Sequence, residues 1–199
     1  FLVPKRIVDQ DGNPGEHNDL RCVSIEHKLG IHGSPTCVMA YGDNDGAIGY
    51  LVGDEHKGLA CRFTMMNNAR LSVASQGLAI AERAYQQART FALDRIQGAA
   101  PGAQGAGPIV RHPDVRRMLL TMRSTVEAMR ALILDTMVAV DTSKHHGDEA
   151  ARAYASRRVD LLTPVIKGWL TDQAVNVSSI GVQVHGGMGF IEETGAAQH

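Results

Sequence analysis

Helical periodicity over most of the chain constrains its fold more than any other feature of the sequence. From about residue 57 to residue 184, apolar side chains recur every three or four positions, which is typical of amphipathic helices. Two stretches rich in glycine or polar residues, 98–108 and 142–148, divide this region into three parts. Each part is much longer than the average globular helix of about 11 residues. Because the apolar pattern is not a strict heptad, it predicts a globular bundle of long antiparallel helices and not a coiled coil.

The three predicted helices differ in the residues that we expect to form their core. The first is rich in alanine, whose small side chain lets neighbouring helices approach closely. The second begins at Pro113 and Asp114, residues that suit a first turn, and carries a methionine-rich stripe that we assign to the bundle core. A fourth helix is expected to begin at Glu192. In the third helix, the residues expected to face the core are Leu161, Leu162, Val165, Ile166, Trp169, Val177 and Ile180.

Residues 1–56 have a different character, because short apolar or β-branched runs alternate with turn residues such as glycine, proline and asparagine. This pattern predicts strands of an antiparallel sheet or barrel. The expected strands are residues 1–3, 20–26, 36–41 and 48–52. The predicted fold class is therefore α+β: residues 1–56 form the end of an antiparallel β domain, and residues 57–199 form a bundle of long antiparallel α-helices.

Charge and composition exclude several classes of partner. The net charge is −1, whereas nucleic-acid-binding domains are usually basic. No apolar run reaches the ~18 residues that a membrane span requires, and we recognise no signal peptide. Three cysteines, without Cys-x-x-Cys spacing, predict small buried thiols in a reducing compartment. The adjacent His145 and His146 lack a helical partner four residues away, so no metal site is expected.

Both ends of the chain lead us to expect an internal piece of a longer protein. The chain begins at Phe1 with a strand-like run and without an initiator methionine. It ends at His199 within a polar helical pattern that contains no stop signal.

One segment, residues 183–190 (Gln-Val-His-Gly-Gly-Met-Gly-Phe), places three glycines among four residues at the end of the third helix. Glycine lets a backbone turn sharply and lets another molecule approach it closely. A P-loop is excluded because no Gly-Lys-Ser/Thr follows the glycines. A dinucleotide-binding fingerprint is excluded because the glycine spacing differs and no strand precedes the segment. From the residues alone, a helix C-cap is the more frequent use of such a turn, and a ligand contact is the alternative.

The same segment resembles the Gln-x-x-Gly-Gly-x-Gly-aromatic signature of the acyl-CoA dehydrogenases. A small β domain followed by long helices resembles the layout of the second half of these enzymes, so the resemblance covers nearly the whole chain. The Gly/Ala-rich loop and the string after Phe190 are most similar to the larger members related to 3-methylmercaptopropionyl-CoA dehydrogenase. The other segments that resemble family motifs, in the family's order, are 25–37 (containing Lys-Leu-Gly-x-x-x-Ser-x-Thr), 52–59, 68–74 and 95–98.

The resemblance implies α,β-dehydrogenation of an acyl-CoA thioester by an FAD enzyme. In this reaction a carboxylate removes the α-proton while the β-hydrogen leaves as hydride to the flavin. The resemblance further implies that Arg95, with Gln97 beside it, reaches the FAD pyrophosphate of a neighbouring subunit. It implies that Gln183, Gly186 and Gly187 meet the adenosine-diphosphate part of that FAD. From the residue alone, Arg95 would instead be a cation that interacts with the dipole at a helix C-terminus.

The sequence departs from the family pattern at two FAD contacts and at the catalytic base. Gln97 precedes Gly98 where the family has a phenylalanine, and Pro113 stands where the next helix often has a glutamine. The usual base, the glutamate of an aromatic-Glu-Gly-Thr segment, is expected beyond His199. The position of the base in a minority of members is occupied by Ala69, which cannot transfer a proton. We therefore expect no catalytic residue in this chain, and no activity of the chain by itself.

The resemblance also implies a substrate contact and several partners. Arg70 matches an arginine beside the substrate cleft, and either assists substrate binding or forms a local hydrogen bond. The implied partners are an acyl-CoA substrate, electron-transfer flavoprotein as electron acceptor, and further copies of the chain in a homodimer or homotetramer. The implied location is the cytoplasm, or the mitochondrial matrix in a eukaryote. An acyl-CoA oxidase-like flavoprotein and a non-catalytic helical scaffold of the same fold remain alternatives.

Overall fold

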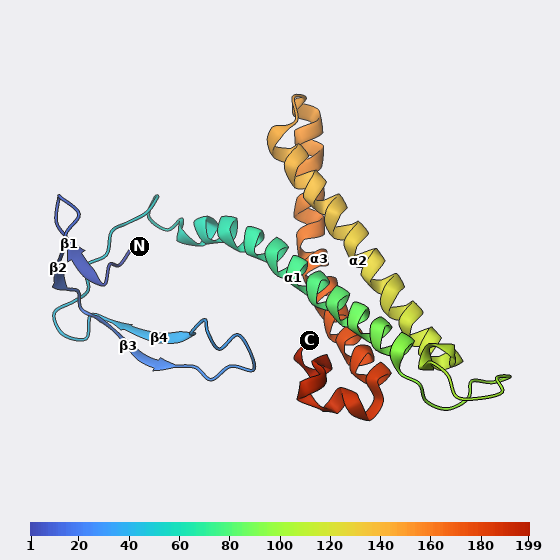
Figure 1. The fold of residues 1–199 in the computed structure, drawn as a ribbon. Coiled ribbons are helices and arrows are strands. Elements are labelled where there is room, and N and C mark those ends of the chain that lie inside the picture. Colours follow the sequence, from blue (N-terminus) through green and yellow to red (C-terminus); the bar gives the residue numbers. More distant parts are fainter. The chain divides into compact units, whose positions relative to one another are not determined.

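The computed structural model describes all residues from Phe1 to His199, which form two compact units, Phe1–Thr64 and Met65–His199. Figure 1 shows the short strands of the first unit and the long helices of the second. Small antiparallel sheets precede three long helices, so the predicted α+β fold class is confirmed. None of the helices combines the length and the apolar character that crossing a membrane requires.

Three long helices dominate the second unit, as the sequence predicts. They are α1 (Gly58–Asp94, which begins in the first unit), α2 (Pro113–His145) and α3 (Glu149–His185). Helices α2 and α3 are neighbours joined by a tight turn and run in opposite directions (Figure 1). The Asp148 carboxylate caps α3 by accepting a hydrogen bond of 3.1 Å from the backbone N–H of Ala150. Such a cap supplies a partner for one of the free N–H groups of a first turn.

Alanine and glycine form the face of α1 that packs against the other helices. A β-carbon added at Gly77 would lie 3.1 Å from the carbonyl oxygen of Leu170 on α3, so the two backbones approach closely. Side chains larger than alanine would hold the helices further apart. The predicted role of the small residues is confirmed. The buried residues of α1 are Leu71, Ala74, Gly77, Ala81, Ala84, Ala88 and Ala92.

The methionine-rich stripe of α2 lies in the core, as predicted. Met122 and Met129 have no exposed surface. A β-carbon added at Gly181 of α3 would lie 3.5 Å from the terminal methyl carbon of Met122 and 3.6 Å from the β-carbon of Ala84 on α1. The three helices therefore meet around this glycine, and the flexible methionine side chain fills the space between them.

The predicted core face of α3 is partly wrong. Ile166 and Val177 are buried, but Leu161, Val165 and Trp169 are exposed. Apolar residues occur on several sides of α3, so the pattern identifies the helix but not its buried stripe. Contacts with α1 and α2 select that stripe, which includes small and polar side chains. Its other members are Ala155, Thr163, Leu170, Ala174, Gly181, Val184 and His185.

The fourth helix expected from Glu192 does not form. The chain after α3 makes three short 3-10 turns instead, η2 (Gly186–Phe190), η3 (Glu192–Thr194) and η4 (Ala196–Gln198). Gly195 separates the last two turns and has a φ of +78°, which is the left-handed conformation. An α-helix cannot continue through a residue in that conformation.

Two two-stranded antiparallel sheets form the first unit. The runs expected at 20–26 and 36–41 pair as β3 and β4, which confirms these strands. The runs expected at 1–3 and 48–52 meet only at one bridge between Leu2 and Tyr50. The first sheet was not expected, because its strands are short and one contains Pro-Gly. The strands are β1 (Arg6–Val8), β2 (Pro14–His17), β3 (Leu20–Ile25) and β4 (Cys37–Tyr41).

A buried asparagine joins three segments of the first unit. The side-chain amide of Asn18 donates hydrogen bonds to the carbonyl oxygens of Pro4 (2.9 Å) and Ile48 (2.8 Å). Its side-chain oxygen accepts from the backbone N–H of Ile48 at 2.9 Å. All polar atoms of this buried side chain are therefore paired, as burial of an amide requires.

The prediction of buried thiols is wrong, because Cys22, Cys37 and Cys61 are all exposed and none forms a disulfide. Cys22 and Cys37 lie on the neighbouring strands β3 and β4. Hydrogen bonding between the two thiols raises the pKa of Cys37. A two-stranded sheet leaves its faces open within this unit, and that explains the exposure of Cys22 and Cys37.

Candidate cofactor and substrate site

Five of the six residues singled out in the sequence come together at one end of the helical unit. Arg95 and Gln97 follow the end of α1, and Gln183, Gly186 and Gly187 lie at the end of α3 (Figure 1). The two helix ends are in contact, because the rings of Phe91 on α1 and His185 on α3 have centroids 4.4 Å apart. Two segments separated by almost ninety residues in sequence therefore lie at the same end of the helical unit.

Backbone hydrogen bonds join the two ends of the loop that follows α1. The backbone N–H of Ile109 donates to the carbonyl oxygen of Arg95 at 2.8 Å. The N–H of Gln97 donates to the carbonyl oxygen of Gly107 at 3.1 Å. The N–H of Gly107 donates to the carbonyl oxygen of Gly98 at 3.0 Å. The glycine-rich loop predicted at 98–108 is thus closed by a short antiparallel ladder. This ladder fixes the backbone that carries Arg95 and Gln97.

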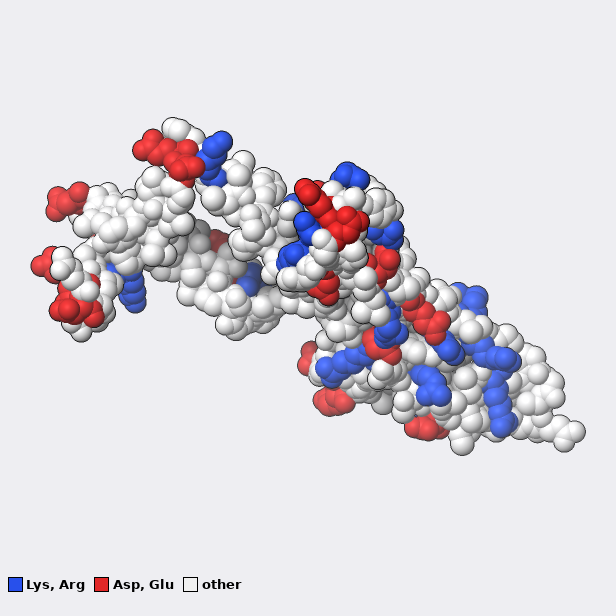
Figure 2. All heavy atoms as spheres, turned by 90° about the horizontal axis from the view of Figure 1, so that it is seen from above, with Lys and Arg blue, Asp and Glu red and all other residues white.

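Arg95 is exposed and forms no ion pair within the chain. Residues 89–123 hold six arginines and two aspartates, and hence a net charge of +4. Figure 2 shows basic side chains gathered over this end of the helical unit. An unpaired guanidinium within a positive region is suited to a phosphate group, with which it can form two parallel hydrogen bonds.

The glycines after α3 serve three different purposes. Gly186 has φ +59° and ψ −140°, a conformation that other residues rarely adopt, and its N–H bonds to the carbonyl oxygen of Gln183 as the C-cap. The C-cap interpretation is therefore confirmed. A β-carbon on Gly189 would lie 2.3 Å from the carbonyl oxygen of Val182, so the turn closes on itself there. Gly187 is exposed, and no atom lies within 4 Å of the place where its β-carbon would stand. Its backbone is open to another molecule.

His185, inside the same segment, was not singled out in the sequence. It is buried, its Nδ1 lies 2.7 Å from the carbonyl oxygen of Gly181, and its ring packs on Phe91. Because a carbonyl oxygen only accepts, Nδ1 carries the proton. His185 therefore joins the ends of α1 and α3 and supports the glycine turn. An apolar-flanked histidine at a helix end gives no distinctive sequence signal for such a role.

Arg70 lies far from this end, because 25 residues of helix separate it from Arg95, roughly 37 Å along α1. Its side chain is half-buried and Nη1 donates to the side-chain oxygen of Asn67 at 3.2 Å, one turn earlier. Of the two roles expected for Arg70, the local hydrogen bond is present. The remaining guanidinium donors are free for a ligand.

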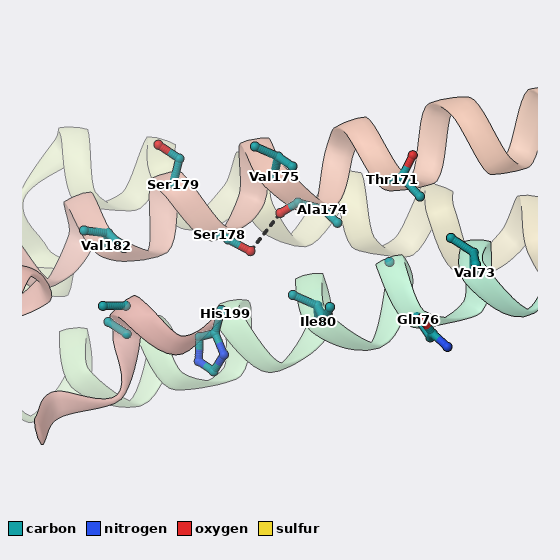
Figure 3. Close-up of a pocket in the computed structure, with 13 residues that line it drawn as sticks. Val73, Gln76, Ile80, Thr171, Ala174, Val175, Ser178, Ser179, Val182 and His199 are labelled. Atoms are coloured by element: carbon teal, nitrogen blue, oxygen red, sulfur yellow. Dashed lines mark hydrogen bonds between the residues drawn. The ribbon is translucent and has the colours of Figure 1, made fainter. Parts of the chain in front are cut away.

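A cleft of about 510 Å³ lies between α1, α3 and the turn η4 (Figure 3). Its walls are mostly apolar, and the Ser178 hydroxyl is engaged by the carbonyl oxygen of Ala174 at 2.8 Å. No carboxylate lines the cleft, and His199 is its only titratable group. The cleft is therefore suited to holding an apolar chain and not to removing a proton from carbon. It is lined by Val73, Gln76, Gly77, Ile80, Thr171, Ala174, Val175, Ser178, Ser179, Val182, Ala196, Ala197 and His199.

A polar groove on the other side of α1 contains the ion pair between Glu82 and Arg130 of α2, at 2.6 Å. Partial burial raises the pKa of Glu82, but hydrogen bonds from Gln86 and Arg130 outweigh it, and the pKa falls below its ordinary value of 4.5. The carboxylate is charged at neutral pH and already paired. We assign this groove to the joining of α1 and α2 and not to the site.

Comparison with known proteins agrees with this arrangement. The sequence model described as "Acyl-CoA dehydrogenase, C-terminal domain" matches residues 56–199. The chain belongs to the acyl-CoA dehydrogenase family. It is 54% identical over its whole length to the 3-methylmercaptopropionyl-CoA dehydrogenase of Ruegeria pomeroyi, so the predicted similarity to these larger members is confirmed. It is 39% identical, over 97% of its length, to a butyryl-CoA dehydrogenase of Syntrophomonas wolfei.

Two solved structures share the fold of this acyl-CoA dehydrogenase family member. Caenorhabditis elegans ACDH-11 in complex with C11-CoA covers 96% of the chain with a TM-score of 0.77 and 25% identity. Butyryl-CoA dehydrogenase from Megasphaera elsdenii covers 91% with a TM-score of 0.71 and 26% identity. The match spans 33% of the ACDH-11 chain and 42% of the Megasphaera elsdenii chain. The chain likewise spans 33% of each of the two curated relatives named above.

Proposed function

We propose that the protein to which this chain contributes is an FAD-dependent acyl-CoA dehydrogenase that forms a double bond between the α- and β-carbons of an acyl-CoA thioester. The observation that carries the proposal is the end of the helical unit where the ends of α1 and α3 are in contact, with unpaired Arg95 after one helix and the open backbone of Gly187 after the other. Family membership supports the same conclusion. Because the chain spans a third of its relatives, the activity belongs to the whole protein.

The residues at this end fit the diphosphate of FAD. Arg95 would pair with the pyrophosphate oxygens, and Gln97 would stand beside it on the fixed ladder. Gln183, Gly186 and Gly187 would meet the adenosine side through exposed backbone and a side-chain amide. FAD supplies, when bound, the acceptor for the hydride that leaves the β-carbon. In our proposal this FAD belongs to a neighbouring subunit of a homodimer or homotetramer, so the site is completed by assembly.

The chain's own residues supply binding and orientation, and the proton is removed by a group outside it. We place the catalytic carboxylate in the segment that follows His199 in the whole protein, and we propose that Arg70 contacts the substrate. The α-proton of a thioester is weakly acidic, so that carboxylate must be desolvated and the carbonyl polarised. We further propose that electron-transfer flavoprotein reoxidises the enzyme in the cytoplasm, or in the matrix of a mitochondrion if the source is eukaryotic.

An absorbance spectrum of the full-length protein tests the proposal. We expect a flavin band near ~450 nm, a property of the cofactor, that bleaches when the right thioester is added without oxygen. The panel should include butyryl-CoA and 3-methylmercaptopropionyl-CoA, after the relatives' substrates. If the protein stays colourless when FAD is supplied, the dehydrogenase proposal is refuted and the alternative of a non-catalytic helical scaffold is favoured. Rapid reoxidation by oxygen would favour the oxidase.

A matched pair of variants tests the cofactor site. Arg95→Gln should raise the Kd of FAD about tenfold, which corresponds to about 1.4 kcal/mol. Arg157→Gln is the control, because Arg157 is also exposed and without an ion pair but lies near the other end of α3. The Kd of FAD is measured by flavin fluorescence, and equal values for the two variants would refute the proposed contact between Arg95 and FAD.

A further inference from the structure

The side chain of Gln87, about two turns before the end of α1, ties the segment after α3 to that helix. Its amide nitrogen donates to the carbonyl oxygen of Thr194 at 2.5 Å, and its amide oxygen lies 2.6 Å from Nε2 of His199. These are the only side-chain hydrogen bonds between α1 and residues 186–199. The partners are more than a hundred residues apart in sequence.

The two hydrogen bonds fix the orientation of every group involved. A backbone carbonyl oxygen only accepts, so the nitrogen of the Gln87 amide must face Thr194. The amide oxygen then faces His199 and accepts from its Nε2–H, which determines the tautomer of the imidazole. Burial lowers the pKa of His199, and electrostatic interactions with Arg83 and His185 lower it further. The imidazole is therefore neutral at pH 7, and the contact is a hydrogen bond between neutral groups.

Other bonds shape this segment but do not hold it to α1. The Thr194 hydroxyl donates within the segment, to the carbonyl oxygens of Met188 and Ile191. Gly195 sits against the Gln87 amide, where an added β-carbon would lie 3.3 Å from the amide nitrogen. Ala196 is buried in the cleft between α1 and α3. Apolar burial of one alanine leaves the direction of the chain at His199 weakly defined, whereas the two Gln87 bonds define it.

We propose that Gln87 is a positioning residue for the dehydrogenation, because it fixes the direction in which the chain leaves His199 toward the segment that carries the catalytic carboxylate. The inference rests on the function proposed above. Displacement of a reacting group by about 1 Å can lower a rate about a hundredfold. Loss of the Gln87 bonds should therefore affect proton removal while the FAD contacts of Arg95 and Gly187 stay intact.

The test compares Gln87→Met with Gln86→Met in the full-length enzyme. Both replacements remove an amide and keep the length of the side chain. Gln86 is the neighbouring exposed residue, and its amide bonds only to Glu82 of its own helix, at 2.6 Å. We expect kcat of Gln87→Met to fall about 10- to 100-fold, with KM and the Kd of FAD changed by less than about threefold. Gln86→Met should keep the wild-type kcat.

A spectroscopic reading separates positioning from general damage. A thioester with sulfur in place of the β-carbon can lose its α-proton but has no β-hydride to give. Its α-deprotonated form bound beside oxidised flavin absorbs at long wavelength. Gln87→Met should show a weaker long-wavelength band than Gln86→Met at saturating ligand. Equal bands and equal kcat in the two variants would overturn the inference.

A second variant keeps the inference testable if Gln87→Met does not fold. Gln87→Glu retains an acceptor for His199 but cannot donate to the Thr194 carbonyl oxygen. It should raise the pKa of His199, seen by NMR titration, and still lower kcat. A wild-type kcat in this variant would overturn the inference. If no thioester bleaches the flavin of the wild-type enzyme, the proposed function itself is refuted. Failure of the Gln87 inference and failure of the proposed function are therefore distinguishable.

Discussion

Alanine substitutions at the three glycines after α3 should separate conformational, steric and ligand effects within one short segment. Gly189→Ala places a β-carbon 2.3 Å from the carbonyl oxygen of Val182, about 1 Å inside a normal C···O contact of about 3.3 Å. Because the clash is with backbone, the turn must move. Overpacking of this kind costs about 1–3 kcal/mol, and we expect about 3 kcal/mol here.

Gly186→Ala acts through conformation. At φ +59° and ψ −140° an L-residue is strained, and such strain costs about 1–3 kcal/mol. Gly187→Ala meets no atom within 4 Å and has no positive φ, so the free energy of unfolding should change by less than about 0.5 kcal/mol. For a chain of this size, each kcal/mol lowers Tm by about 2–4 °C. Thermal unfolding of the three variants should thus rank Gly187→Ala as the most stable and Gly189→Ala as the least.

The same series tests the cofactor contact. If FAD lies against the open backbone of Gly187, the added methyl group should raise the Kd of FAD about tenfold, or about 1.4 kcal/mol, while Tm of the apoprotein stays unchanged. Flavin fluorescence during titration measures this Kd. A Gly187→Ala protein that loses as much Tm as Gly189→Ala would refute the geometric argument. An unchanged Tm with an unchanged Kd would refute the cofactor contact alone.

Three further predictions concern stability. Leu170→Ala should lower the free energy of unfolding by about 2–5 kcal/mol because Leu170 has no exposed surface. Leu161 is 68% exposed on the same helix, so Leu161→Ala should change this free energy by less than about 0.5 kcal/mol. Urea titration measures both changes. The pKa of Glu82 is lowered in the folded state, so its stabilisation is present above pH 4.5 and is lost as pH falls through the folded pKa. Glu82→Gln should remove that part of the acid dependence in thermal melts between pH 3 and 6, roughly one unit and more on either side of the ordinary value. Asn18→Ala should leave buried carbonyl and N–H groups without partners and lower Tm, with a cost of about 1–3 kcal/mol, measured by calorimetry.

Much of the helical unit was predictable because the signals involved are local. Apolar spacing located α1, α2 and α3 to within a few residues, and Pro113 and Gly186 marked a helix start and a helix end. The order of the motifs along the chain also indicated the family. Such signals depend on residues a few positions apart, whose side chains share a helix face whatever the rest of the chain does.

The remaining features depend on contacts between distant segments. Which face of α3 is buried was decided by packing against α1 and α2, and Leu161 was therefore placed wrongly from its apolar character. The left-handed Gly195 divides the chain after α3 into turns where a helix was expected. The contact of Gln87 with Thr194 joins residues more than a hundred positions apart, and nothing in the composition of α1 identifies that glutamine among its neighbours. The sequence by itself thus determined the elements and the family, because these follow from local spacing and motif order. Only the tertiary structure decided that Arg95 and the glycine turn lie at the same end of the helical unit, because that depends on two helix ends meeting in space.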